Sequence, residues 1–136
     1  MPSLPAFEQV IETGIYVDDL GAAERFYCGV LGLRRISGRA GRDLFLAVGG
    51  NVLLVFYAQE TQRGDVLPPH GAQGPSHFAL QVENAADLER WKDHLLASGV
   101  TVEKEMDWGE PGLRSIYFRD PAGNLVEIIV RGIWPV

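Results

Sequence analysis

The chain repeats itself, and this repeat limits the fold more than any other feature of the sequence. A shift of 65 residues places Glu12–Val17 on His77–Val82. A shift of 73 residues places residues 50–55 on residues 123–128. Self-similarity at a nearly fixed spacing indicates a duplicated structural unit. The 136 residues therefore predict two related halves rather than one indivisible fold.

Each half is predicted to run strand, helix and then three strands, which gives an α+β fold of two βαβββ repeats. Short apolar runs bounded by glycines predict the strands, and apolar residues at helical spacing predict the helices. In the first half we expect strands at 10–17, 33–37, 43–48 and 51–57 and a helix over 20–31. In the second half we expect strands at 76–82, 100–106, 113–119 and 124–130 and a helix between Asn84 and Gly99. The first repeat is expected at about residues 8–58, a Gly- and Pro-rich linker at about 59–75 and the second repeat at about 76–132.

Length, charge and cysteine content narrow the class of protein. A chain of 136 residues suits a single domain with its own core. Twelve Lys and Arg residues against eighteen Asp and Glu residues give a net charge of −6, which argues against general nucleic-acid binding. The one cysteine, Cys28, excludes an internal disulfide. The sequence has neither a membrane-spanning apolar run nor a signal-peptide pattern, so a cytoplasmic protein that acts on a small molecule is expected.

Three side chains that can bind a metal occupy equivalent positions in the two halves. Glu12 corresponds to His77 on the first strand of each half, and Leu54 corresponds to Glu127 on the last strand. Glu127 has apolar neighbours on its own strand face, so its carboxylate needs a partner. One imidazole and two carboxylates suit a divalent Mn, Fe, Co, Ni or Zn ion and leave positions open for substrate. Our hypothesis is a metal site of Glu12, His77 and Glu127; taken singly, each of these residues is more often an ordinary surface or packed residue than a metal ligand.

Residues on the strand beside Glu127 are candidates for contact with substrate. Ser115, Tyr117 and Arg119 alternate on one strand face. Tyr117 is the candidate catalytic residue, since its hydroxyl could bond to an oxygen held by the metal. Arg119 could hold a substrate anion or pair with a carboxylate. The segment 120–123 is interpreted as a turn.

Four stretches of the chain also match a known family. These are Tyr-Val-Asp-Asp-Leu at 16–20, Arg-Phe-Tyr-Cys-Gly-Val-Leu-Gly-Leu at 25–33, Ser-His-Phe-Ala-Leu-Gln-Val at 76–82 and Ser-Ile-Tyr-Phe-Arg-Asp-Pro-Ala-Gly-Asn-Leu-Val-Glu at 115–127. The chain resembles the vicinal oxygen chelate superfamily, which includes glyoxalase I, bleomycin- and fosfomycin-resistance proteins and extradiol dioxygenases. The resemblance implies curved mixed sheets around a cleft, with the helices on the outer face, and a homodimer.

The resemblance also implies roles for individual residues. His77 and Glu127 fall on the usual second-half metal ligands, and Glu12 lies where many members have His or Gln. Leu54 stands where glyoxalase I has a carboxylate for metal binding and proton transfer, which speaks against that reaction. The resemblance then favours a metal-dependent lyase, isomerase or dioxygenase-like enzyme whose oxygen-bearing substrate chelates the cation; the reaction is not assigned.

A metal-free binding protein is the alternative function. Bleomycin-resistance proteins hold a cationic drug in an acidic, aromatic cleft, and the aromatic residues here keep that reading open; the candidate substrate-binding residues are Tyr16, Phe56, Trp108, Ser115 and Arg119. Fosfomycin-type chemistry is disfavoured because the site region offers only Arg114 and Arg119 as cations. Dioxygenase chemistry uses further histidines, and only His70 and His94 are left for it. A purely structural protein is the third reading.

Overall fold

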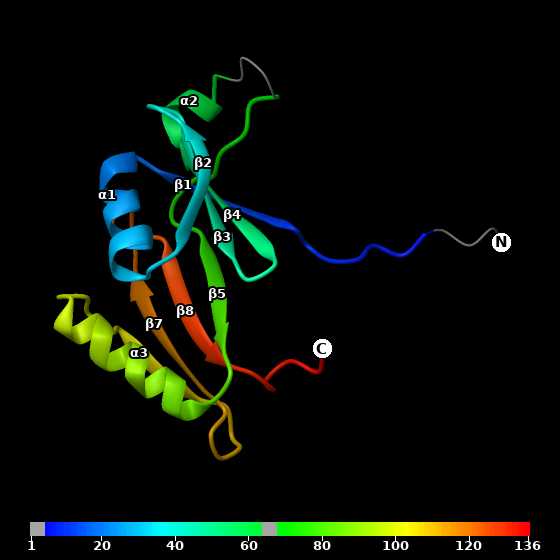
Figure 1. Ribbon diagram of the computed structural model, residues 1–136, viewed down its shortest axis with the longest axis vertical. Helices are drawn as coiled ribbons and strands as arrows, with labels where there is room; N and C mark the ends of the chain where they lie inside the picture. Colours follow the sequence, from blue (N-terminus) through cyan, green and yellow to red (C-terminus); the bar gives the residue numbers. More distant parts are fainter. Residues whose placement is uncertain (1–4, 64–67) are drawn as a thin grey trace.

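Two four-stranded sheets make up the computed structural model, which describes residues 5–63 and 68–136 (Figure 1). The first sheet has the order β1-β4-β3-β2 and the second has the order β5-β8-β7-β6. In each sheet the first strand runs parallel to the last, and the other pairs are antiparallel. This arrangement confirms the predicted α+β fold of two βαβββ units. The strands are β1 Glu12–Val17, β2 Arg34–Arg39, β3 Asp43–Val48, β4 Asn51–Tyr57, β5 His77–Val82, β6 Lys104–Asp107, β7 Arg114–Arg119 and β8 Leu125–Val130.

The helices cover one side of the sheets, and the chain termini extend from the other side (Figure 1). In the first half α1 (Leu20–Glu24) continues directly into a π-helical segment, η1 (Arg25–Val30). In the second half α3 (Ala85–Ala97) packs on β5, β7 and β8. The side chains of Asp19 and Asn84 each accept a backbone N–H in the first turn of α1 and α3, so both helices begin at a capping residue.

The first helix departs from regular α-helical geometry in its second part. The N–H of Leu31 donates to the carbonyl of Phe26 (3.0 Å), five residues back. This wider turn rotates consecutive side chains by less, so that Phe26 and Tyr27 are both buried. It also brings Cys28 against the core, although the helical pattern predicts a side chain that points away. Burial raises the pKa of Cys28, and Glu24 adds to the rise, so the thiol stays protonated near neutral pH.

A short helix occupies the start of the segment predicted as a linker. Helix α2 (Ala58–Thr61) follows β4 directly, and its last residue, Thr61, is buried and donates to the carbonyl of Ala58 (3.2 Å). The glycines and prolines that predict a loop begin only at Gly64, so the four residues of α2 are free to form one turn. Residues 68–76 contain no helix or strand.

Strand alternation separates a helix-covered face from an open face in each sheet. Strand alternation places Ile11, Thr13, Ile15 and Val17 on one face, and of these Ile15 and Val17 are buried under the helices. Thr13 is exposed at the start of β1, and Ile11 precedes the strand and is 48% exposed. In the second sheet Val126, Ile128 and Val130 belong to the core, and the partly buried Phe78, Leu80 and Val82 pack against it, as the alternation predicts.

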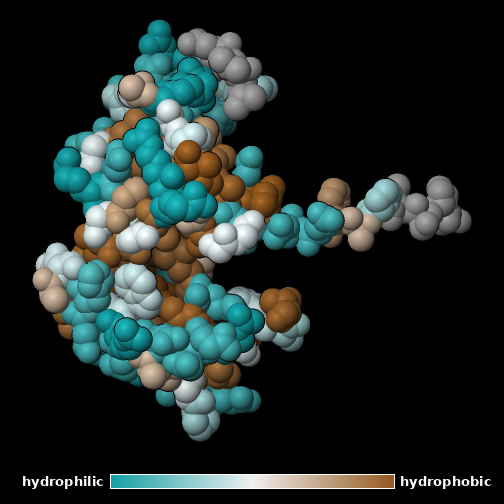
Figure 2. Space-filling model, in the orientation of Figure 1, coloured by the Kyte–Doolittle hydropathy of each residue, from teal (hydrophilic) through white to brown (hydrophobic). Residues whose placement is uncertain are grey.

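The two halves share one hydrophobic core. The ring of Phe26 lies 6.1 Å from that of Phe118, and the ring of Tyr27 lies 6.3 Å from that of Phe78, between centroids. Hydrophobic residues gather where the upper and lower parts of the molecule meet (Figure 2). The hydroxyl of Tyr27 donates to Asp120 Oδ2 (2.8 Å), so a buried hydrogen bond also joins the halves.

We expect the buried Tyr27 to make stability fall at alkaline pH. Burial raises the pKa of Tyr27 well above its usual range, and the Asp120 carboxylate adds to the rise. An unfolded tyrosine ionises from about pH 10 while native Tyr27 keeps its proton. The stabilisation is therefore complete below pH 10 and is lost as pH rises above it, by about 1.4 kcal/mol per pH unit. Urea unfolding at pH 8 and at pH 11 should show a smaller alkaline loss for Tyr27→Phe than for wild type; equal losses would contradict this.

Candidate functional site

The open face of the second sheet carries a buried carboxylate. Glu127 lies on β8 between Ala79 of β5 and Tyr117 of β7, which are its partners in the strand register. It is only 6% exposed, and its Oε2 is buried without a hydrogen-bond partner among the described residues. An ionised carboxylate in such a place is costly unless a cation or a proton compensates it. The position therefore calls for a positive partner.

The imidazole of His77 provides one side of a site for that partner. Its Nε2 lies 3.3 Å from Glu127 Oε1, and its Nδ1 lies 3.0 Å from the carbonyl oxygen of Leu125. A carbonyl oxygen only accepts, so the contact assigns the proton to Nδ1. In a neutral ring Nε2 then directs a lone pair at a carboxylate oxygen. The pair can hold a second proton, which makes an ion pair, or a metal ion between the two atoms.

The third predicted ligand does not reach this pair within one chain. Glu12 is exposed on β1, at the edge of the other sheet, with Val52 as its partner in the register. Over residues 5–63 and 68–136 no three His, Cys, Asp or Glu side chains form a group that could hold a metal ion. The structure therefore brings together His77 and Glu127 and leaves Glu12 on a separate edge.

Tyr117 lies beside the pair, as its place on the neighbouring strand requires. Its ring centroid is 6.2 Å from that of His77, with the two planes inclined by 31°. Burial raises the pKa of Tyr117; Glu127 adds to the rise, and a hydrogen bond with Ser115 opposes it. The phenol thus keeps its proton near neutral pH and can donate a hydrogen bond next to Glu127.

The other candidates on this face are engaged in protein contacts. The buried hydroxyl of Ser115 accepts a hydrogen bond from Trp108 Nε1 (3.0 Å). Arg119 binds Glu103 (3.1 Å) and the carbonyl of Gly123 (3.0 Å), so of its two predicted roles the structure shows the ion pair.

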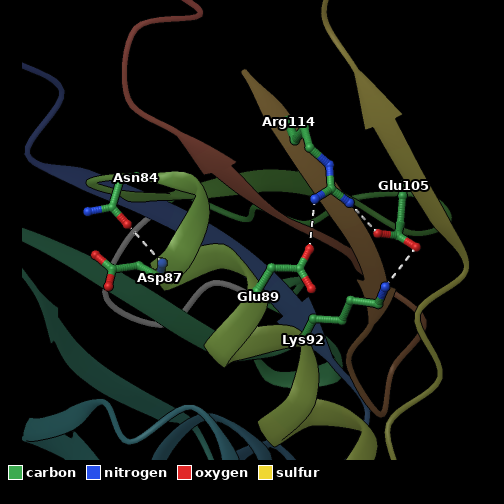
Figure 3. Close-up of polar contacts among 6 residues, drawn as sticks. All are labelled: Asn84, Asp87, Glu89, Lys92, Glu105 and Arg114. Atoms are coloured by element: carbon green, nitrogen blue, oxygen red, sulfur yellow. Dashed lines mark hydrogen bonds and ion pairs between the residues drawn. The ribbon is translucent and has the colours of Figure 1, made fainter. Parts of the chain in front are cut away.

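A network of charged residues lies on the helix side of the second half (Figure 3). Arg114 reaches between two carboxylates, Glu89 of α3 at 2.7 Å and Glu105 of β6 at 2.6 Å. Lys92 also binds Glu105, at 3.0 Å. The charge of Arg114 is therefore already matched by carboxylates, and it is no ready cation for an anionic substrate.

Aromatic side chains gather on the open face of the first sheet. Tyr16 stacks on Phe56 with 5.8 Å between centroids, and Phe45 meets Phe56 edge-on at 6.4 Å. His70 lies against both rings: its Nδ1 is 2.8 Å from the Tyr16 hydroxyl, and its ring is 4.8 Å from that of Phe56. The predicted binding residues Tyr16 and Phe56 thus lie on a different sheet from His77 and Glu127. His70 is not among the residues predicted to bind a ligand, because its loop has no apolar periodicity that would show where the loop lies.

Known proteins are similar to this chain over almost its whole length. The family model described as Glyoxalase/Bleomycin resistance protein/Dioxygenase superfamily matches residues 9–128. A lactoylglutathione lyase from Agrobacterium tumefaciens is 38% identical, with a TM-score of 0.90 over 96% of this chain and 98% of that one. A glyoxalase-related enzyme from Fulvimarina pelagi is 25% identical, with a TM-score of 0.73 over 96% of this chain and 93% of that one.

A third solved structure agrees at the level of the fold. The glyoxalase/bleomycin resistance protein/dioxygenase from Nocardioides is 21% identical, with a TM-score of 0.74 over 98% of this chain and 91% of that one. Among the described residues, no helix has the length and apolar character needed to cross a membrane.

Proposed function

Because the chain belongs to the glyoxalase/bleomycin resistance protein/dioxygenase superfamily, we propose that it is a metal-dependent enzyme acting on an oxygen-bearing small molecule. The proposed ligands of the divalent cation are His77 and Glu127 of one copy and Glu12 of a second copy. Mn, Fe, Co, Ni and Zn all accept this combination of imidazole and carboxylate.

The observation that carries the proposal is the pairing of His77 with a buried carboxylate whose Oε2 has no hydrogen-bond partner among the described residues. Glu127 Oε2 is buried and has no hydrogen-bond partner among the described residues, and Glu127 Oε1 lies 3.3 Å from Nε2 of His77. Two ligands bound to one cation at about 2.0–2.2 Å lie about 2.8–3.6 Å apart, so this spacing fits a shared cation. The Nδ1 contact to Leu125 is the hydrogen bond that orients a ligating imidazole.

A second copy of the chain is the proposed source of the third ligand. Glu12 and His77 both begin edge strands, and both side chains are exposed. The segment before Glu12 exposes apolar side chains, among them Phe7 (100%) and Val10 (78%). Unpaired strand edges beside exposed apolar residues favour association between chains. We therefore expect a homodimer in which β1 of one copy lies near β5 of the other.

The chain's own residues suggest how such a site would work. A bound divalent cation supplies Lewis-acid polarisation of a substrate oxygen. Tyr117 holds its proton beside Glu127 and can donate a hydrogen bond to an oxygen where negative charge develops. Leu54, in the Glu127-equivalent position of the first sheet, cannot accept a proton. We therefore do not propose a reaction that needs a second carboxylate at this position. The relative from Agrobacterium tumefaciens is described as a lactoylglutathione lyase, so lactoylglutathione is the first substrate to assay, but it is not assigned to this chain.

Metal titration tests the proposal. We expect wild-type protein freed of metal by a chelator to bind one equivalent of at least one of Mn²⁺, Fe²⁺, Co²⁺, Ni²⁺ or Zn²⁺ per chain in calorimetry. His77→Ala and Glu127→Gln should each weaken binding by at least about 100-fold, since each removes a ligand. His94→Ala is the matched control, because His94 is an exposed histidine on α3 whose Nε2 lies 2.8 Å from the Val30 carbonyl and whose ring meets that of Trp91, away from Glu127. Wild-type protein that binds none of the five ions would refute the metal site.

A metal-free binding protein is the second candidate, and the aromatic group of Tyr16, Phe45, Phe56 and His70 supports it. Stacked aromatic rings hold flat or cationic ligands. In this case benzyltrimethylammonium or a similar aromatic cation should raise the melting temperature in the presence of a chelator. Stabilisation only by ligands that also need metal would exclude it.

A further inference from the structure

The turn that follows β7 is a buried polar hub. Asp120 and Asn124 are 4% and 2% exposed. Oδ1 of Asp120 accepts the backbone N–H groups of Ala122 (2.9 Å) and Asn124 (2.8 Å). Oδ2 accepts the hydroxyl of Tyr27 (2.8 Å) and the side-chain amide of Asn124 (2.9 Å). A turn that only reverses the chain direction needs none of these buried hydrogen bonds. The group of Asp120 and Asn124 therefore also holds other parts of the molecule in place.

The amide of Asn124 connects three strands. Its Oδ1 accepts the N–H of Ser76 (2.8 Å), immediately before β5. Its Nδ2 donates to the carbonyl of Tyr16 (3.1 Å) on β1, in the other half of the chain. Asn124 itself precedes β8, so one side chain fixes the starts of β5 and β8 against the end of β1.

These bonds lead directly to the His77–Glu127 pair. Ser76 precedes His77, and its carbonyl accepts the N–H of Leu125 (2.8 Å). The carbonyl of Leu125 in turn faces Nδ1 of His77 (3.0 Å), and Glu127 lies two residues further along β8. Loss of the Asn124 amide would remove the hydrogen bond that holds Ser76, next to His77. The start of β5 could then move relative to β8, whose Leu125 carbonyl orients the ring of His77.

We propose that Asn124 is a positioning residue that holds His77 in the ring orientation and tautomer needed to share a cation with Glu127. The part concerning a cation rests on the proposed function. Asn51 provides a comparison within the chain, because the repeat makes it equivalent to Asn124. Asn51 is exposed, and its side chain has no hydrogen bond to the described residues. Among the described residues, the side-chain hydrogen bonds made by Asn124 are therefore found only in the half that carries the His77–Glu127 pair.

Zinc affinity separates positioning from a general structural effect. We expect Asn124→Ala to weaken Zn²⁺ binding by about 10- to 100-fold, the range seen when a ligand loses its supporting bond. Asn51→Ala should leave the affinity within about twofold of wild type, as for a surface change. Tyr27→Phe breaks the hub at Asp120 without touching Ser76, so it should lower the unfolding midpoint and keep the zinc affinity. Equal weakening by Asn124→Ala and Tyr27→Phe would overturn the proposal, as would unchanged affinity in Asn124→Ala.

The His77 ring nitrogens give a readout that needs no metal. In ¹⁵N NMR spectra of metal-free protein we expect one tautomer of His77, protonated at Nδ1, in wild type and in Tyr27→Phe, and averaged tautomers in Asn124→Ala. Unchanged His77 signals in Asn124→Ala would overturn the proposal. If wild type binds no metal, the proposed function fails and the NMR signals alone decide the role of Asn124. If Asn124→Ala does not fold, Ser76→Pro removes the same hydrogen bond from its donor side and takes its place in both measurements.

Discussion

Co-expression of the Glu12→Gln and His77→Ala variants restores metal binding that neither variant has alone. This is the expected result if each site takes Glu12 from one copy and His77 with Glu127 from the other. In the mixed dimer one site loses both altered ligands, and the other site keeps all of its ligands. Random pairing makes half of the dimers mixed, so about a quarter of the wild-type sites should return. In the mixed dimer purified through separate tags on the two copies, one site of two is intact, so metal analysis should find about half of the wild-type metal content.

A second mixture provides the control for this experiment. His77 and Glu127 lie on the same sheet of the same copy, 3.3 Å apart. A mixed dimer of His77→Ala and Glu127→Gln therefore carries one defect in each of its two sites, and no binding should return. Recovery in both mixtures, or in neither, would contradict a site shared between copies.

The second large effect concerns stability, and we expect Asp120→Ala to lower the free energy of unfolding by about 3–5 kcal/mol. The buried carboxylate accepts four hydrogen bonds, from Tyr27, Ala122 and both nitrogens of Asn124. Each is worth about 0.5–1.5 kcal/mol, and the donors left buried without a partner add to the loss. Urea unfolding at pH 7 measures the change.

Asp107→Ala is the matched control for Asp120→Ala. Asp107 also accepts a backbone N–H in a turn, that of Gly109 (3.0 Å), but the contact is exposed. An exposed substitution of this kind usually changes stability by about 0.5 kcal/mol or less. Similar losses in the two variants would show that the buried hub contributes no more than an ordinary turn.

Apolar runs in the sequence predicted the bounds of a strand well where glycines mark the turns beside it. The pair Gly49 and Gly50 separates β3 from β4, and both strands have the predicted bounds, Asp43–Val48 and Asn51–Tyr57. The strand predicted from Val100 begins only at Lys104. The N–H of Val100 donates to the carbonyl of Leu95 (2.9 Å) as α3 ends, so this residue completes the helix terminus instead of joining the sheet.

The repeat predicted only the part of the candidate site whose residues lie on strands of the same sheet. The repeat places His77 and Glu127 on neighbouring strands of one sheet, where their side chains meet. The repeat also makes Glu12 equivalent to His77. Equivalent positions in two repeats need not lie close together in space, and within one chain Glu12 forms no metal-binding group with His77 and Glu127 among the described residues. His70 reaches Tyr16 across 54 residues, along a loop whose course no periodicity encodes.

The matched positions of Leu54 and Glu127 bear on how such a chain can change in evolution. Leu54 lies between Gly14 and Phe45, as Glu127 lies between Ala79 and Tyr117. One of the two related units thus has an ionisable side chain at this place, and the other has a hydrocarbon side chain. Mutations on the Leu54 side can reshape the surface offered to a ligand while the His77–Glu127 pair remains intact.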